Sequence, residues 1–229
     1  MKAYLTCFIL LFAASAQAQE GNSLMFRIGI GTYAMHSQKL FQKDFQKGNP
    51  IPYGTVHAFP SFPTFGGSMG FGISPSISIG VRAEYASTGG RLHYKDYSGH
   101  AVMDQTLSAV QVGPFVQVRA NNSPSWPVHL TLFGSAANVV ETIQSEVKVG
   151  TRLETEKIRL TALNLALRPG IQVGHSVGIF HVLLALEGEI QHANKLTDAQ
   201  DRYITTSDSK NLVANWGGLR TSLGVGVKF

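Results

Sequence analysis

The amino-acid sequence predicts an all-β protein, an eight-stranded antiparallel up-and-down transmembrane β-barrel. Apolar residues alternate with small or polar ones along nearly the whole chain, and the connections between the alternating segments are in turn short and long. The chain has 229 residues, which suits one barrel domain. Only 14% of the residues are charged and the net charge is +5. This composition argues against a disordered chain and gives no basic block for binding nucleic acid.

The first 18 residues are predicted to be a signal peptide. Lys2 supplies a positive charge, residues 5–14 form an apolar run, and Ala16-Gln17-Ala18 is a small-x-small cleavage site. The apolar run is too short for a transmembrane helix, which needs about 20 residues. Residues 19–229 are therefore predicted to form the exported barrel domain. The only cysteine, Cys7, lies in the signal peptide, so we expect no disulfide in the mature chain.

The strands are placed by their period-2 alternation. The last strand is the clearest, because Leu219, Leu223 and Phe229 belong to an apolar face whose opposite face is glycine, serine or charged. The same pattern predicts eight strands at 24–34, 65–73, 77–85, 110–118, 128–136, 163–173, 182–190 and 219–229. No window beyond residue 23 shows an extended helical pattern, so no helix is expected.

The connections divide into two groups. Those at 35–63, 88–105, 141–157 and 192–214 are long and polar, whereas those at 74–76, 119–127 and 174–178 are short. Short turns on one side and long loops on the other, with both chain ends on the short-turn side, are typical of an outer-membrane barrel. The first long connection carries Lys39, Lys43 and Lys47. It is interpreted as a solvated loop, with binding of anionic lipopolysaccharide as the alternative.

The composition of the two strand faces indicates which one faces lipid. No charged residue occurs on the apolar face, and glycines such as Gly66, Gly80 and Gly170 recur on the other face. Glycine weakens a solvated strand but fits the narrow interior of a small barrel, so the apolar face is predicted to point outward. The alternative is a soluble periplasmic carrier whose apolar face points inward. Pro114 and Pro169 each remove a ladder donor, which predicts local bulges.

Several charged residues fall on the inward face and need partners there. The residues predicted to form a lumen charge cluster are Arg82, Glu84, Arg168, Glu187, Glu189 and Arg220. Arg27, Arg119 and Lys228 are predicted to lie at the mouth on the short-turn side. Together these residues predict a salt-bridged plug. A narrow porin-like channel with a basic lining is the alternative.

The signal peptide, the eight alternating segments, the inward Arg/Glu cluster and the final strand ending in Phe229 resemble the small outer-membrane barrels of the OmpA/OmpX-like superfamily. The terminal aromatic resembles the signal by which the barrel-assembly machinery recognises its clients. The resemblance implies an integral protein of a Gram-negative outer membrane, in contact with membrane lipids and lipopolysaccharide. It also implies a structural, adhesion or surface-interaction role.

No catalytic, metal or cofactor site is predicted. Lipid A deacylases with a similar architecture use a His-x-Ser arrangement, which His181-Val182-Leu183 does not provide. The pair Glu187 and Glu189 is compatible with paired carboxylates, but it is interpreted as partners for arginines. The histidines of the long connections show no ligand spacing. We therefore expect a non-enzymatic protein without cofactor or nucleic acid, and a monomer.

Overall fold

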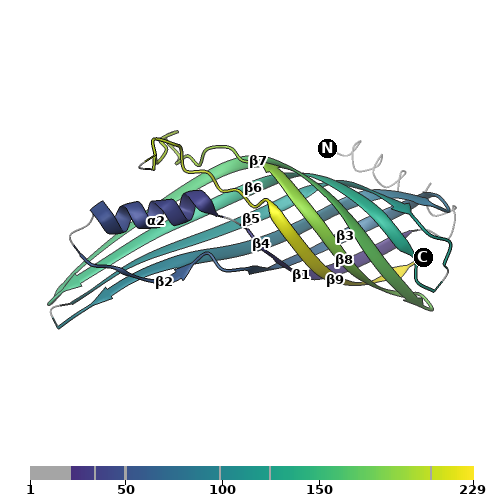
Figure 1. Ribbon diagram of the computed structural model, residues 1–229, viewed down its shortest axis with the longest axis horizontal. Coiled ribbons are helices and arrows are strands. Elements are labelled where there is room, and N and C mark those ends of the chain that lie inside the picture. Colours follow the sequence, from purple (N-terminus) through teal and green to yellow (C-terminus); the bar gives the residue numbers. More distant parts are fainter. Residues whose placement is uncertain (1–21, 34, 49–50, 98, 124, 207) are drawn as a thin grey trace, which may run out of the picture.

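The computed structural model describes residues 22–33, 35–48, 51–97, 99–123, 125–206 and 208–229 (Figure 1). The predicted signal peptide, 1–18, lies outside this part of the chain. The elements in chain order are β1 (Ser23–Gly31), α2 (His36–Gly48), β2 (Gly54–Ala58), β3 (Phe62–Ser74), β4 (Ile77–Lys95), β5 (Gly99–Arg119), β6 (Val128–Val149), β7 (Arg152–Val177), β8 (Phe180–His192) and β9 (Gly218–Lys228).

Eight of the strands form a closed antiparallel ring. The order is β1-β3-β4-β5-β6-β7-β8-β9, and β9 pairs back with β1 to close it. The short strand β2 stands outside the ring and pairs with the far end of β4. Closure gives every ring strand two neighbours, so backbone donors and acceptors are satisfied without water. The predicted eight-stranded barrel is confirmed.

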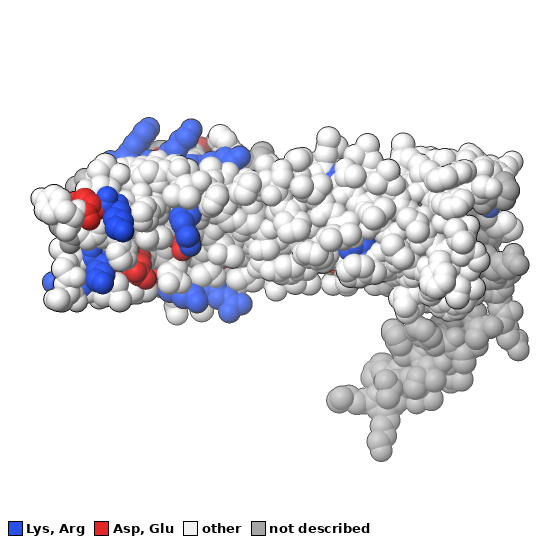
Figure 2. Space-filling view, turned by 90° about the horizontal axis from the view of Figure 1, so that it is seen from below, with Lys and Arg blue, Asp and Glu red and all other residues white. Residues whose placement is uncertain are grey.

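An apolar belt surrounds the part of the barrel in which all eight strands take part. Its outward side chains include Leu24, Val81, Leu163 and Leu184, and each of these is about half exposed. Figure 2 shows that this surface carries few charged residues, whereas lysines, arginines and acidic residues gather at one end of the molecule. The apolar face therefore points outward, as predicted. Among the described residues, no helix is long and apolar enough to span a membrane.

Four strands extend far beyond the belt. β4, β5, β6 and β7 have 19, 21, 22 and 26 residues, whereas about 9–11 residues suffice to cross a bilayer. The prediction of long polar loops at 88–105 and 141–157 is wrong. These segments are the paired upper arms of two β-hairpins, joined by short turns after Lys95 and after Val149.

The first long connection is also more ordered than predicted. It contains the helix α2 and the strand β2, so the predictions of a solvated loop at 35–63 and of no helix are wrong. Helix α2 lies along the upper arms of the hairpins, at the end opposite to the C-terminus (Figure 1). We call the upper arms of β4 to β7, together with α2, β2 and residues 193–217, the head.

The head has a hydrophobic core of its own. Leu92, Leu107, Leu160 and Trp216 are fully or almost fully buried and belong to one apolar cluster. Trp216 stands edge-on to Phe62, with a distance of 5.1 Å between the ring centroids. Burial of apolar surface stabilises by about 25 cal/mol per Å², so these residues contribute to the stability of the head.

The bulges predicted at the two prolines do not form. The strand register continues unchanged on both sides of Pro114 and of Pro169, although each proline is skipped in the pairing with one neighbour. Proline has no backbone N–H to donate, but its φ is compatible with a strand, so the register is kept on both sides. The described bulge or irregularity in the ring lies instead between Gly72 and Ser74, next to a turn.

Candidate functional site

An ion-pair network fills the lumen at the level of the belt. Arg82, on β4, donates to both carboxylate oxygens of Glu187 on β8, at 2.6 and 2.8 Å. Its Nε also donates to Oε1 of Glu84, at 2.6 Å. Each of these side chains is at most 5% exposed. Two parallel donor bonds of this kind fix the plane of the guanidinium as well as its charge.

Arg168 joins the two halves of the network. It pairs with Glu84, its Nη2 donates to Glu189 at 2.7 Å, and its Nη1 lies 3.5 Å from Glu187. Arg220 completes the set, with its Nη2 2.5 Å from Oε2 of Glu189. The structure thus brings all six residues of the predicted lumen cluster into one connected network. Loss of one member would remove part of the charge compensation on which its buried partners depend.

Amide and aromatic side chains that the sequence analysis missed complete the network. Gln111 donates to Glu189 at 2.9 Å and accepts from Arg168, and Gln172 accepts from Arg27 at 3.3 Å. The guanidinium groups of Arg82 and Arg168 lie about 5 Å from the ring of Phe133. All three missed residues have inward parity on strands that were correctly located. Their burial could have been predicted from that parity, but their partners could not.

Two glycines leave room for the glutamates. Gly66 is the cross-strand partner of Glu84, and Gly170 is the partner of Glu187. A Cβ on either glycine would stand 2.6 Å from the Cγ of the glutamate opposite. The glycines on the inward face are therefore needed for the close approach of strand backbone to the charged side chains.

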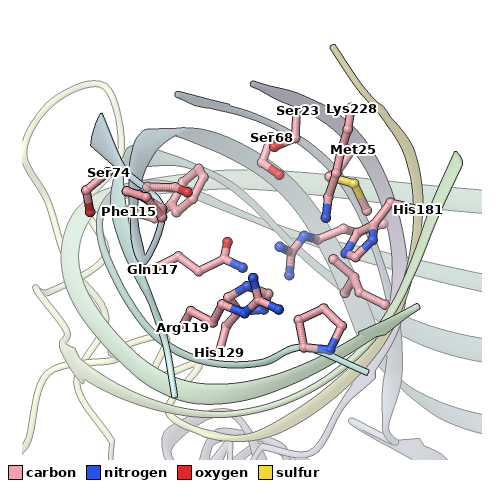
Figure 3. A pocket seen from close by; sticks show the side chains of 15 residues that line it. Ser23, Met25, Ser68, Ser74, Phe115, Gln117, Arg119, His129, His181 and Lys228 are labelled. Atoms are coloured by element: carbon pink, nitrogen blue, oxygen red, sulfur yellow. The ribbon is translucent and has the colours of Figure 1, made fainter. Parts of the chain in front are cut away.

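The three basic residues predicted at the mouth on the short-turn side line one cavity. Arg27, Arg119 and Lys228 contribute to its wall, and its volume is about 160 Å³. Figure 3 shows Arg119, His129 and His181 pointing into this space from different strands. Arg27 lies deepest, because it is 4% exposed and its Nη1 is 3.8 Å from Glu187 of the lumen network. The cavity and the network therefore share a boundary.

A serine and a histidine also meet beside this cavity. Ser176 Oγ lies 2.9 Å from Nδ1 of His181, and Nζ of Lys228 donates to the same oxygen at 3.3 Å. The sequence analysis missed this contact because it considered only neighbours along the chain. A serine and histidine at this distance resemble part of a nucleophilic site, which also needs a group that orients the histidine and an oxyanion hole. Neither is found among the described contacts of this pair.

A buried carboxyl group occupies the head, beyond the belt. Glu141 is fully buried, and its neighbours across the sheet are Leu107 and Leu160. Its oxygens accept from the amides of Gln38 on α2 and Gln105 on β5, at 3.3 and 3.2 Å. No described cation pairs with it, and burial raises the pKa of Glu141 from 4.5 to about 7.

The two amide oxygens beside Glu141 have no hydrogen-bond partner among the described residues. Burial without a described cation and the raised pKa both favour the neutral form of Glu141 in the folded head.

The C-terminal residue, Phe229, follows the last strand at the same end of the barrel as the cavity. The N–H of Phe229 donates to the carbonyl of Asn22 at 3.0 Å, and its side chain is 66% exposed. The role of Phe229 in recognition by the assembly machinery stays a prediction.

Comparison with known proteins gives only remote likenesses. No protein-family model and no curated protein matches the sequence. Among solved structures, Ail, the attachment invasion locus protein of Yersinia pestis, is 13% identical, covers 93% of this chain and 100% of its own, and gives a TM-score of 0.39. Neisserial surface protein A is 13% identical, with 92% and 98% covered and a TM-score of 0.36.

The outer membrane protease OmpT from Escherichia coli is 11% identical, with 93% and 98% covered and a TM-score of 0.37. These three likenesses are too remote to assign a function. The function must be inferred from the chain's own geometry.

Proposed function

We propose that this chain is an integral outer-membrane protein with a closed lumen and no catalytic role, which presents its head outside the cell as a rigid surface for adhesion or for binding a partner. The observation that carries the proposal is the ordered head itself. A strand needs only about 9–11 residues to cross the bilayer, yet β7 has 26 and its upper arm packs over an apolar core. A core of this size is not needed to anchor or close a barrel.

Closure of the lumen is supported by the ion-pair network. The guanidinium groups and carboxylates of Arg82, Arg168 and Glu187 are at most 3% exposed and contact one another across the barrel. An eight-stranded barrel has an interior just wide enough for side chains to fill. A narrow channel would require these ion pairs to separate, which leaves buried charges unpaired.

The sheet of the head offers one edge for a partner. At the β4 edge, β2 pairs with β4, with Gly54 opposite His93. At the β7 edge, β8 pairs with β7 between Leu165 and Val177 and not with the upper arm. Among the described residues, the upper arm of β7, from Arg152, therefore has strand pairing on the β6 side and a single bridge, Thr161 to Thr197, on the other. Such an edge can pair with an extended segment of another chain.

The first experiment combines conductance with adhesion. The full chain is compared with a variant that lacks 90–105 and 143–158, which removes the upper arms and keeps the belt. Both are checked for a shift in gel mobility on boiling, which a closed barrel shows because no edge is free. We expect no single-channel conductance from the full chain in planar bilayers, and adhesion of expressing cells that the shortened variant loses. Stepwise conductance, or equal adhesion by both proteins, would contradict the proposal.

A further inference from the structure

The cavity beside the two ends of the barrel domain is a second candidate site, separate from the head. It has a volume of about 160 Å³, whereas a cavity needs only about 10–15 Å³ to hold one water molecule. Side chains from β1, β5, β6, β8 and β9 converge on it, so a rigid sheet holds its wall on several sides. Figure 3 shows the polar groups of Gln117, Arg119, His129 and Lys228 directed into the space.

The cavity is strongly cationic. Arg27, Arg119 and Lys228 line it, and no aspartate or glutamate does among the described residues. A concave site lined by one sign of charge and walled by protein concentrates the opposite ion. The wall also carries the hydroxyl groups of Ser23, Ser68 and Ser78, which are hydrogen-bond donors suited to an oxyanion.

The buried donors of Arg27 are a second indication of a ligand, independent of the number of cations in the wall. Its side chain is 5% exposed, and its Nε and Nη1 have no hydrogen-bond partner among the described residues. Nη2 donates to Gln172 at 3.3 Å, and the nearest carboxylate contact of Nη1, with Glu187, is 3.8 Å long. Burying guanidinium donors without acceptors is costly, so an oxygen ligand at this position would be stabilising.

The other two cations are already held in place. Arg119 donates through Nε to the carbonyl of Asn121 at 2.9 Å and through Nη2 to that of Ser123 at 2.6 Å. Lys228 donates to Ser176 at 3.3 Å. Because these contacts use neutral acceptors, the positive charges are fixed without being neutralised. A site with its cations fixed beforehand loses less conformational entropy when an anion binds.

We propose that this cavity binds a phosphate group, which Arg27 and Lys228 hold from two sides. Arginine is suited to phosphate because its planar donors match the spacing of phosphate oxygens, and lysine adds a point charge. The volume admits a tetrahedral oxyanion. The phosphate can belong to inorganic phosphate or to a lipid headgroup that enters from the adjacent leaflet.

The test measures binding by calorimetry with the full chain refolded in a non-ionic detergent. Inorganic phosphate and glycerol 3-phosphate are titrated separately at constant ionic strength, so that general screening does not change. The variants are Arg27→Gln and Lys228→Gln, and the control is Lys148→Gln, which removes one exposed lysine at the far end of β6. The shift in gel mobility on boiling verifies that each variant folds. Lys228→Gln keeps the test valid if Arg27→Gln does not fold.

We expect saturable binding of one phosphate group per chain, at least ten-fold weaker in Lys228→Gln and unchanged in Lys148→Gln. Tighter binding of glycerol 3-phosphate than of inorganic phosphate would assign the site to a lipid headgroup, and the reverse order would assign it to the free ion. The proposal is overturned if neither probe saturates, or if Lys228→Gln binds as tightly as Lys148→Gln.

Discussion

The belt and the head share four strands, β4 to β7, yet within these strands they bury opposite kinds of residue. At the level of the belt the inward side chains are polar or charged, such as Arg82 and Arg168, while Leu163 faces outward. In the head, Leu107 is buried inside the sheet, and Arg91 is exposed on the outside. The surroundings explain the difference, because lipid favours apolar side chains and water does not.

The two regions consequently depend on different forces. The removal of apolar surface from water cannot stabilise the interior of the belt, because that interior is more polar than the exterior. Hydrogen bonds and ion pairs stabilise it instead. The head is held by removal of apolar surface from water, as in a soluble domain. Loss of a buried charged or polar side chain should therefore destabilise the belt, whereas loss of a buried apolar side chain should destabilise the head.

The largest effect is expected when the centre of the lumen network is removed. Arg168→Met removes the cation that Glu84, Glu187 and Glu189 share, which should lower the free energy of unfolding by about 3 to 5 kcal/mol. Urea unfolding in detergent, followed by gel mobility, measures it. The control is Arg91→Met, which breaks the exposed pair with Asp104 and should cost less than about 1 kcal/mol. Equal effects would show that the network does not stabilise the barrel.

A slightly smaller effect is expected in the core of the head. Trp216→Ala removes a fully buried ring and should cost about 3 kcal/mol, at the low end for buried aromatics, because the indole N–H has no described partner. We expect proteases to cut the head of this variant, while the belt stays folded in detergent as long as the sample is not boiled. If the belt unfolds together with the head, the two regions are not separate units.

The buried carboxyl group of the head should make its stability depend on pH. The folded-state pKa of Glu141 is about 7 and its ordinary value is 4.5. The unfolded chain therefore releases this proton first, and stability falls as pH rises from 4.5 to 7, by on the order of 3 kcal/mol, then levels off. Glu141→Gln should remove this loss. Protease resistance of the head between pH 4.5 and 8 measures it.

The matched control for that pH series is Glu156→Gln, which changes an exposed carboxylate on the neighbouring strand β7. It should leave the pH dependence of the head unchanged. A pH dependence that persists in Glu141→Gln would mean that another group controls it.

The smallest effect is expected from the glycines of the inward face. Gly170→Ala places a Cβ against Glu187 and should cost about 1 to 3 kcal/mol in the urea series. Gly134→Ala is the control, because an added Cβ there meets no atom within 4 Å. A loss of stability in both variants would assign the cost to the sheet backbone rather than to crowding of the glutamate.

The sequence predicted the barrel better than it predicted the head. Period-2 alternation located all eight ring strands, but it failed where the polarity of the faces reverses. On β5 the buried positions Leu107 and Ala109 are followed by outward Val110 and Val112, so the apolar phase shifts by one residue. Such a shift breaks the pattern although the strand continues. The sequence pattern of the upper arm therefore predicts a loop.

Helix α2 escaped prediction for a related reason. Its fully buried residues are Gln38 and Gln42, while Phe41 and Phe45 pack against the core beside them, so the face that packs inward is mixed in polarity. Lys39, Phe41 and Lys43 meanwhile alternate with period 2 by coincidence. For the lumen, parity identified which charges point inward. The choice of partners, such as Gln111 for Arg168, depends on the closed ring and could not be read from one strand.

One strand, β7, passes from lipid into water, and along it the outer face changes from apolar to charged. Leu165 and Lys157 lie on the same outward face of β7, eight residues and roughly 26 Å apart. Leu165→Cys and Lys157→Cys, each made in a Cys7→Ser chain, are treated with a membrane-impermeant maleimide on intact cells. The account predicts rapid labelling at position 157 and none at 165. Labelling at both positions at the same rate would contradict it.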